Sequence, residues 1–480
     1  MASYQELRQQ YPVFLFRKSQ WQETDVSLLL EWEFVLDENT QFYPTMTIPL
    51  PDGWRERVTD EEISELALQI GMVELLSYWK LTASPTIVIE AGYFSPEQLD
   101  WWHELLLNGM GEYFYLNQID FTQPDFVSFR CEMPKPARPT QTIQSLQSAQ
   151  ETSDQLDRML VPIGGGKDSI VALELLRQWR QQSGPVKSGQ IGLFAVNPTT
   201  AAMDVIVTSG MPSVVIQRTL DPQLFTLNQQ GFLNGHTPFS ALLSFISLLT
   251  AKLHGYTVTI LGNEQSANEG NVSYLGRAIN HQYSKSFHYE SAFRQYVSTY
   301  LQPQFDTSLP TYFSLLRPFN ELQIAKIFAN QAEAYLPLFR SCNRGHKTNS
   351  WCGECAKCLF AFTVLFPFLG EQQISAVFGQ NLFEKTDLLP IALDLNGQTK
   401  NKPFDCVGTY QESQVAFFLS YQWYLQTEQA IPPLLDAIFQ QVPLNAVDQK
   451  QTSHQLLISF SPEHNIPSQL ALYLQKILGK

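Results

Sequence analysis

The chain lacks several features that would assign it to a particular class of protein. No apolar run reaches the ~18 residues that a membrane span needs, and the first residues have no signal-peptide layout. Basic residues are too few for a nucleic-acid-binding face, because 31 Lys and Arg stand against 46 Asp and Glu and the net charge is −15. We find no internal repeat. These absences predict a cytoplasmic globular protein that binds neither membrane nor nucleic acid.

Cysteine is scarce as well, at six in 480 residues. So few cysteines do not make a disulfide framework in a chain of this length, and they indicate reduced thiols. Four of them have the spacing C-x9-C-x2-C-x2-C, at Cys342, Cys352, Cys355 and Cys358. Four thiolates suit tetrahedral zinc, and a ligand set filled by the protein predicts a structural role. An iron–sulfur cluster and four cysteines without a metal are the alternatives.

Length and composition predict a globular chain of about two or three domains. Hydrophobic residues make up 44% of the chain, as in an ordinary globular protein. Residues 134–155 are polar and rich in proline and glutamine, which is typical of a linker. We therefore predict an N-terminal α/β or α+β domain at 1–133, a second domain at 156–370 that includes the four-cysteine cluster, and a C-terminal region at 371–480.

Apolar runs alternate with helical patterns from residue 156 onward, which predicts βαβ units and an α/β fold with a parallel sheet. Ligands bind such a sheet at the carboxyl ends of its strands. Strands are expected at 159–163, 191–197, 214–218 and 257–262, with helices at 170–182, 200–209 and 238–254. Elsewhere we expect strands at 26–36 and 86–90 and helices at 60–78 and 414–422.

The segment most indicative of chemistry reads VPIGGGKDS, residues 161–169. It joins a predicted strand to a predicted helix through three glycines, Gly164, Gly165 and Gly166. Glycine lets the backbone approach a ligand closely, and N–H groups at a helix N-terminus suit an anion such as phosphate. Lys167 and Ser169 could add contacts to the anion, and Asp168 could hold magnesium. The segment is neither a Walker A loop nor a G-x-G-x-x-G fingerprint, and a glycine turn without a ligand is the alternative.

Two further polar segments are candidates to border the same site. The first follows the strand at 257–262 and contains Asn263, Glu264, Asn268 and Glu269. Its glutamates could bind magnesium and its asparagines ribose or phosphate, whereas a solvated loop is the alternative. The second enters a predicted helix and carries Arg317 and Lys326, which could reach phosphates or could be surface charges on a helix and its cap.

Cys406 stands apart from the cluster, in a short polar stretch at 404–409. A lone cysteine is most often a small buried hydrophobe, and a chemical role is the alternative. The segment around His281 and His288 is polar and aromatic-rich. It could bind an acidic substrate or be a solvated loop.

Residues 164–169 resemble the pyrophosphate loop, S-G-G-x-D-S, of the N-type ATP pyrophosphatases, with Gly164 where that pattern has serine. Enzymes of that class cleave ATP between the α and β phosphates and form an adenylated intermediate. The resemblance implies a central parallel sheet of the ATP pyrophosphatase type in residues 156–370. The 7-cyano-7-deazaguanine synthases pair such a loop with a similar cysteine cluster, but this chain is too long for them and residues 263–271 do not look like their substrate loop.

A closer resemblance is to the UDP-N-acetyl-α-D-muramoyl-L-alanyl-L-glutamate epimerases. It extends over roughly residues 160–410 and does not reach the first 130. The segments that carry it are 163–169, 262–271, 317–320, 341–343, 351–358, 367–369 and 403–409. The resemblance implies inversion of the terminal L-Glu of a UDP-muramoyl dipeptide to D-Glu for peptidoglycan, driven by ATP and magnesium.

The resemblance also implies roles for the residues named above. The glycines, Lys167 and Ser169 would hold the ATP phosphates, and Asp168 with Glu264 or Glu269 would hold magnesium. Cys406 is the candidate for proton transfer, since thiols serve that role in glutamate racemases, and Asp405 or Glu412 could serve instead. Another adenylating enzyme, a tRNA-modifying enzyme and a nucleotide sensor without catalysis are the alternatives. The sequence does not predict an oligomeric state.

Overall fold

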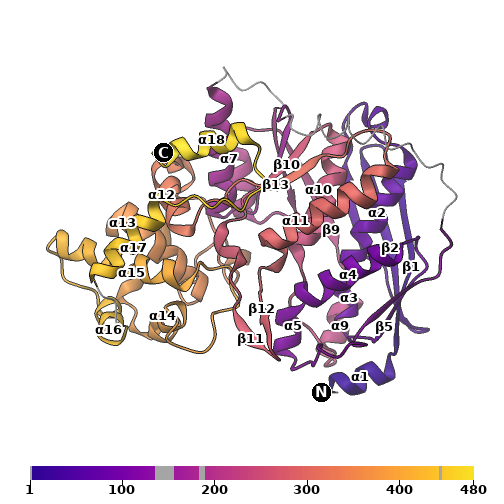
Figure 1. Ribbon diagram of the computed structural model, residues 1–480, viewed down its shortest axis with the longest axis horizontal. Coiled ribbons are helices and arrows are strands. Elements are labelled where there is room, and N and C mark those ends of the chain that lie inside the picture. The colour runs from indigo at the N-terminus through magenta and orange to yellow at the C-terminus, as the bar shows by residue number, and fades with distance from the viewer. Residues whose placement is uncertain (1–2, 136–155, 183–189, 443–445, 480) are drawn as a thin grey trace.

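The computed structural model describes residues 3–135, 156–182, 190–442 and 446–479 (Figure 1). The predicted linker at 134–155 lies almost wholly outside the described residues.

One large mixed sheet runs through the described part of the chain, in the order β13-β10-β7-β8-β9-β4-β2-β1-β5-β6, with β3 paired to β2. Five strands form its parallel half: β13 (Thr311–Ser314), β10 (Val258–Leu261), β7 (Met159–Pro162), β8 (Ile191–Val196) and β9 (Ser213–Thr219). The other half is built from β4 (Thr45–Pro49), β2 (Ser27–Asp37), β1 (Val13–Glu23), β5 (Thr86–Ile89), β6 (Ser128–Cys131) and β3 (Thr40–Phe42).

The predicted α/β class is confirmed, and every strand expected in the parallel half is present. The sheet does not end there, because β4 pairs antiparallel with β9 and so joins the N-terminal strands to the parallel half. Arg218 on β9 reinforces this junction by donating to both carboxylate oxygens of the buried Glu74 at 2.8 and 2.9 Å. The strands on either side of residue 133 thus belong to one sheet, and the division of the chain into domains stays a prediction.

Capping residues define where several helices begin. Thr59, Asn320 and Thr409 each make a capping box with Glu62, Gln323 and Glu412, respectively. The helices of the N-terminal half are α1 (Tyr4–Gln10), α2 (Asp60–Glu74), α3 (Leu76–Trp79), α4 (Pro96–Gly109) and α5 (Gly111–Leu116). Next come α7 (Lys167–Gln181), α8 (Thr200–Ser209), α9 (Gln223–Gln229), α10 (Phe239–His254), α11 (Phe287–Tyr296) and α12 (Glu321–Gln331). The C-terminal helices are α13 (Ala356–Phe378), α14 (Leu389–Leu395), α15 (Tyr410–Gln426), α16 (Pro433–Gln441), α17 (Ala446–Ile458) and α18 (Ser468–Ile477).

Two apolar cores hold these layers together. One lies between the N-terminal strands, α2, α4 and α10, and the other between the parallel strands, α7, α12, α13 and α15. Figure 1 shows the C-terminal helices, in orange and yellow, gathered on the side of the parallel strands away from the N-terminal strands. A hairpin of β11 (Val272–Tyr274) and β12 (Arg277–Ile279) lies beside α5, between these two parts of the molecule (Figure 1).

Helix α13 is, by length and composition, long and apolar enough to cross a membrane, which the sequence analysis did not anticipate. However, 61% of its most apolar window is buried inside the protein. It also contains a kink at Gly370, whose φ is 72°. The Trp423 side chain packs against this glycine, since a Cβ there would lie 3.2 Å from it. Its apolar character is therefore explained by its burial at the centre of the C-terminal helical layer.

Candidate active site

The glycine loop connects β7 to α7, as predicted. Gly165 has a φ of +83°, and a Cβ at this position would lie 2.8 Å from the backbone nitrogen of Ala202, so only glycine fits. The Gly165 carbonyl accepts a hydrogen bond from Arg340 N at 2.9 Å. A Cβ on Gly164 would meet nothing within 4 Å, because this residue faces open space. The loop is thus packed against α8 and Arg340 on one side and open on the other.

A pocket of about 310 Å³ lies in front of the loop. Gly164, Gly166, Asp168 and Ser169 line one side of it, Asn263 and Glu264 another, and residues 340–349 a third. The two loops touch, since a Cβ on Gly262 would lie 2.8 Å from the Asp168 carbonyl oxygen. The two loops follow β7 and β10, which are neighbouring parallel strands. Their carboxyl ends lie at the same edge of the sheet, so the loops lie side by side, as expected.

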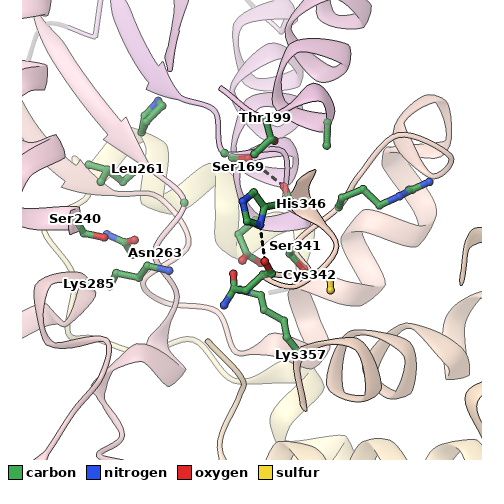
Figure 2. Close-up of a pocket in the computed structure, with 18 of the residues that line it drawn as sticks. Ser169, Thr199, Ser240, Leu261, Asn263, Lys285, Ser341, Cys342, His346 and Lys357 are labelled. Atoms are coloured by element: carbon green, nitrogen blue, oxygen red, sulfur yellow. Dashed lines mark hydrogen bonds between the residues drawn. The ribbon is translucent and has the colours of Figure 1, made fainter. Parts of the chain in front are cut away.

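Cationic side chains line the pocket, but Lys167, the cation of the glycine motif, is not among them. Lys167 is 7% exposed and lies between two carboxylates beside the pocket, with Nζ 2.6 Å from Asp168 and 2.5 Å from Glu321. Instead, Lys285, Lys357 and Arg340 line the pocket, and Figure 2 shows the two lysines reaching it from different segments of the chain.

Buried carboxylates gather next to these cations. Burial first, and the neighbouring Asp168 second, raise the pKa of Glu264. Burial likewise raises the pKa of Glu321 to about 8, although the charge of Lys167 opposes this. Carboxylates so close together are a suitable ligand set for a divalent cation, because the cation would relieve their repulsion. Asp168 and Glu264 are the two that also line the pocket.

Other predicted site residues lie outside the pocket. Arg317 is fully buried and donates to the backbone oxygens of Glu264 and Lys285 and to Glu290, so it supports the pocket wall from behind. Lys326 is exposed on α12. Asn268 caps α11 by accepting from Phe287 N at 2.8 Å, and Glu269 pairs with Lys402 at 3.0 Å.

Glu412, an alternative candidate for proton transfer, is also engaged elsewhere. It is 1% exposed and accepts hydrogen bonds from the Ser266 hydroxyl and from the backbone nitrogens of Thr409 and Glu321. It therefore links three segments behind the pocket.

Cys406 lies in a smaller cavity of about 30 Å³ next to the pocket. The two spaces share Asp168, Glu264, Lys285, Ser341 and Lys357 as lining residues. Lys285 Nζ donates to Cys406 Sγ at 3.3 Å. Burial alone would raise the pKa of the thiol, but Lys285, Lys357 and His281 outweigh it and hold the pKa well below its ordinary value. The surroundings of Cys406, the thiol named in the sequence analysis, therefore favour the thiolate form.

Asp405 precedes Cys406 in sequence, and its pKa is shifted upward rather than downward. Burial, followed by the negative charges of Cys355 and Cys406, raises the pKa of its carboxyl. Its Oδ1 accepts a hydrogen bond from Asn343 Nδ2 at 3.2 Å, and Asn343 lines the pocket. The pKa shifts of these two neighbouring residues therefore have opposite directions.

The four clustered cysteines come together as the spacing predicts. Their sulfurs lie within 4.8 Å of one another, with separations of 3.9 Å for Cys342–Cys355, 3.6 Å for Cys352–Cys358 and 3.5 Å for Cys355–Cys358. Tetrahedral thiolates at the zinc–sulfur bond length are about 3.8 Å apart, so this cluster could hold a metal ion. All six cysteines are free of disulfides.

Two family models match the chain, that of the MurL N-terminal domain over residues 5–315 and that of the MurL C-terminal domain over residues 338–453. Three curated relatives carry the name UDP-N-acetyl-alpha-D-muramoyl-L-alanyl-L-glutamate epimerase. The relative from Salinispora tropica is 34% identical over 87% of this chain and 86% of its own. The relative from Micromonospora sp. is 32% identical over 90% of this chain and 90% of its own. The relative from Xanthomonas oryzae pv. oryzae is 29% identical over 82% of this chain and 82% of its own. No solved structure matches.

An α/β protein with a glycine loop at the strand ends of its sheet, together with relatives named as epimerases, supports an isomerase. The chain belongs to the MurL epimerase family, whose two models together span most of its length. The family resemblance predicted from residues 160–410 is therefore confirmed, and it extends to the N-terminal region, where no motif had been recognised.

Proposed function

We propose that this protein inverts the terminal L-Glu of UDP-N-acetylmuramoyl-L-Ala-L-Glu to D-Glu, using ATP and magnesium to form an acyl-adenylate. The observation that carries the proposal is that two neighbouring cavities share five lining residues, one cavity bordered by the glycine loop and the other by Cys406. The names of the relatives support the substrate.

The need for ATP follows from the chemistry of the reaction. An α-proton next to a carboxylate is a very weak acid, because its removal places a second negative charge beside the first. Adenylation removes the charge of the carboxylate and makes its carbonyl a better electron sink. A neighbouring base can then take the proton, and an acid can return one to the other face. Hydrolysis of the adenylate releases AMP and the D-Glu product.

ATP is proposed to bind in the manner of a pyrophosphate loop. The open backbone of Gly164 and Gly166 and the Ser169 side chain face the pocket and would receive the phosphates. Lys285, Lys357 and Arg340 supply positive charge there, whereas Lys167 holds Asp168 in place by an ion pair. Asp168 and Glu264 would hold Mg²⁺, which neutralises phosphate charge when bound.

Cys406 and Asp405 are the proposed pair for proton transfer. The lowered pKa of Cys406 favours the thiolate, which can accept a proton, and the raised pKa of Asp405 makes its carboxyl easier to protonate than an ordinary aspartate. Two groups of opposite tendency are what an inversion requires, since one face of the carbon loses a proton and the other gains one.

The four-cysteine cluster is proposed to hold one structural zinc ion per chain. Cys342 follows Arg340 and Ser341, which lie against the glycine loop, so a metal at the cluster would fix one wall of the pocket. We place the protein in the cytoplasm, where UDP-linked peptidoglycan precursors are made. We propose no nucleic-acid or membrane partner.

The test is to incubate the protein with ATP, Mg²⁺ and UDP-N-acetylmuramoyl-L-Ala-L-Glu in D₂O. AMP and deuterium at the glutamate α-carbon are expected together. Asp168→Ala should abolish AMP formation, whereas Lys326→Ala, an exposed residue away from the pocket, should leave it unchanged. AMP without deuterium would instead indicate a ligase or amidating enzyme that uses the same adenylate.

A further inference from the structure

We propose that His281 and Glu112 are positioning residues that keep Cys406 as a thiolate, in a cysteine–histidine–glutamate arrangement built from three distant parts of the chain. The inference deepens the proposed function, on which it rests for the role of Cys406 in proton transfer. It adds two residues from the N-terminal two-thirds of the chain to a site otherwise formed around the glycine loop.

The imidazole of His281 is held on one side by Glu112. Glu112 lies on α5, and His281 follows the hairpin of β11 and β12. His281 Nδ1 donates to Glu112 Oε2 at 2.5 Å, across 169 residues of sequence. Both side chains are mostly buried, at 13% and 12% exposure. A carboxylate on Nδ1 fixes the ring orientation and stabilises its protonated form.

His281 also interacts with Cys406, and this interaction raises the pKa of the imidazole and lowers that of the thiol. With Nδ1 engaged by Glu112, the second ring nitrogen is the one left for the thiolate. Burial opposes protonation of the ring, but the hydrogen bonds to Cys406 and Glu112 outweigh it and raise the pKa of His281 to about 9. The ring is therefore a cation at neutral pH.

A second set of contacts fixes the distance between the histidine and the cysteine segments. The side chain of Asn271 accepts from His281 N at 2.8 Å and donates to the Pro403 carbonyl at 2.7 Å. The Asn271 carbonyl also accepts from Lys402 N at 3.0 Å. One buried residue thus ties the backbone of His281 to the loop that carries Cys406.

The remaining charges around the thiolate favour the same state. Lys285 donates to Cys406 directly, and Lys357 adds a second positive charge. The His236 ring lies 4.4 Å from that of His281 and stays neutral, because burial and the nearby positive charges lower its pKa to about 3. The titratable and charged groups that face the Cys406–His281 pair are Lys285, Lys357, Glu112, His236, Glu264, Asp168 and Asp405.

The protonation of Cys406 is the direct readout of this inference. The ultraviolet absorbance of the thiolate, taken as the difference between the native protein and Cys406→Ser, would be titrated in the full-length protein. In the native protein the midpoint should lie well below the ordinary thiol value of about 8.5. His281→Gln should move it upward by about one unit or more, and Glu112→Gln should move it in the same direction by less.

Activity gives a second readout that separates positioning from folding. His281→Gln should lower deuterium incorporation at the α-carbon by about 10²-fold at neutral pH, while AMP formation stays near the native rate. His288→Gln is the matched control, since His288 is an exposed histidine of the same segment whose ring pairs with Tyr283. It should leave both readouts unchanged.

Three results would overturn the inference. The first is a native midpoint for Cys406 in both His281→Gln and Glu112→Gln, and the second is an equal shift in His288→Gln. The third is a second metal ion per chain that disappears in Glu112→Gln, because Glu112, His236 and His281 lie close enough to ligate one. Absence of AMP in the native protein would refute the proposed function but not this inference, which the thiolate titration tests alone.

Discussion

Replacing Gly165 by alanine tests whether the glycine loop forms the nucleotide site. Alanine at a φ of +83° carries a backbone strain of about 1–3 kcal/mol. Its Cβ would also lie 2.8 Å from Ala202 N, a backbone atom at the start of α8 that cannot rotate away. Relieving this contact costs a further ~1–3 kcal/mol. We expect Gly165→Ala to lower the free energy of unfolding by about 2–6 kcal/mol, measured by urea denaturation.

The same substitution should impair catalysis, because the loop must move to accommodate the methyl group. Displacement of the loop would also strain the hydrogen bond from Arg340 N to the Gly165 carbonyl. A shift of this size costs about 10²-fold in rate, so the specificity constant for ATP in AMP formation should fall accordingly.

Gly164→Ala is the matched control for this experiment. A Cβ on Gly164 meets nothing within 4 Å, so the free energy of unfolding should change by less than about 0.5 kcal/mol. Because the methyl group would enter the pocket, the KM for ATP should rise. The reasoning is refuted if Gly165→Ala unfolds at the native urea concentration and retains the native KM for ATP.

Three more predictions concern the pocket wall, the metal and pH. Arg317→Met should lower the free energy of unfolding by about 3–5 kcal/mol, since it removes the ion-pair partner of the buried Glu290, whereas Lys326→Met should change it little; equal effects on unfolding would show that Arg317 is not a wall support. Metal analysis should find about one zinc per chain, and its removal by a chelator should lower thermal stability and raise the KM for ATP; a metal-free protein with native stability would contradict this. Deuterium incorporation should fall as pH rises through about 9, where the imidazolium of His281 loses its proton. It should also fall at low pH, once the pH drops below the lowered pKa of Cys406 and the thiolate is protonated. The high-pH limb should be absent from His281→Gln, and its persistence there would assign that limb to another group.

The parallel half of the fold was predictable because its signals are local. Apolar runs such as 159–163 and 191–197 are bounded by glycine and polar residues, and the helices α7 and α8 follow them closely. The N-terminal strand β1 was missed, since only its first residues are apolar and its second half, with Lys18 and Gln20, faces solvent. The pairing of β4 with β9 was also missed, because it joins residues about 170 positions apart and depends on tertiary packing.

The candidate site shows the same division between local and distant information. The glycine loop and the segment after β10 could be placed together from topology alone. Lys167 was expected to face the phosphates, but its charge is taken up by Glu321, 154 residues away. Arg317 was expected to reach phosphates and instead supports the wall behind them. No sequence pattern links Lys285 and Lys357 to Cys406, or Glu112 to His281, so only the structure brings these groups together.

The central claim is that adenylation and inversion of glutamate occur in one site. The most direct measurement is the joint assay of AMP and of deuterium at the glutamate α-carbon, in D₂O with ATP, Mg²⁺ and UDP-N-acetylmuramoyl-L-Ala-L-Glu, for the native protein, Asp168→Ala and Cys406→Ser. We predict both products for the native protein, neither for Asp168→Ala, and AMP without deuterium for Cys406→Ser. Deuterium incorporation by Asp168→Ala in the absence of AMP would contradict the claim that adenylation drives the inversion.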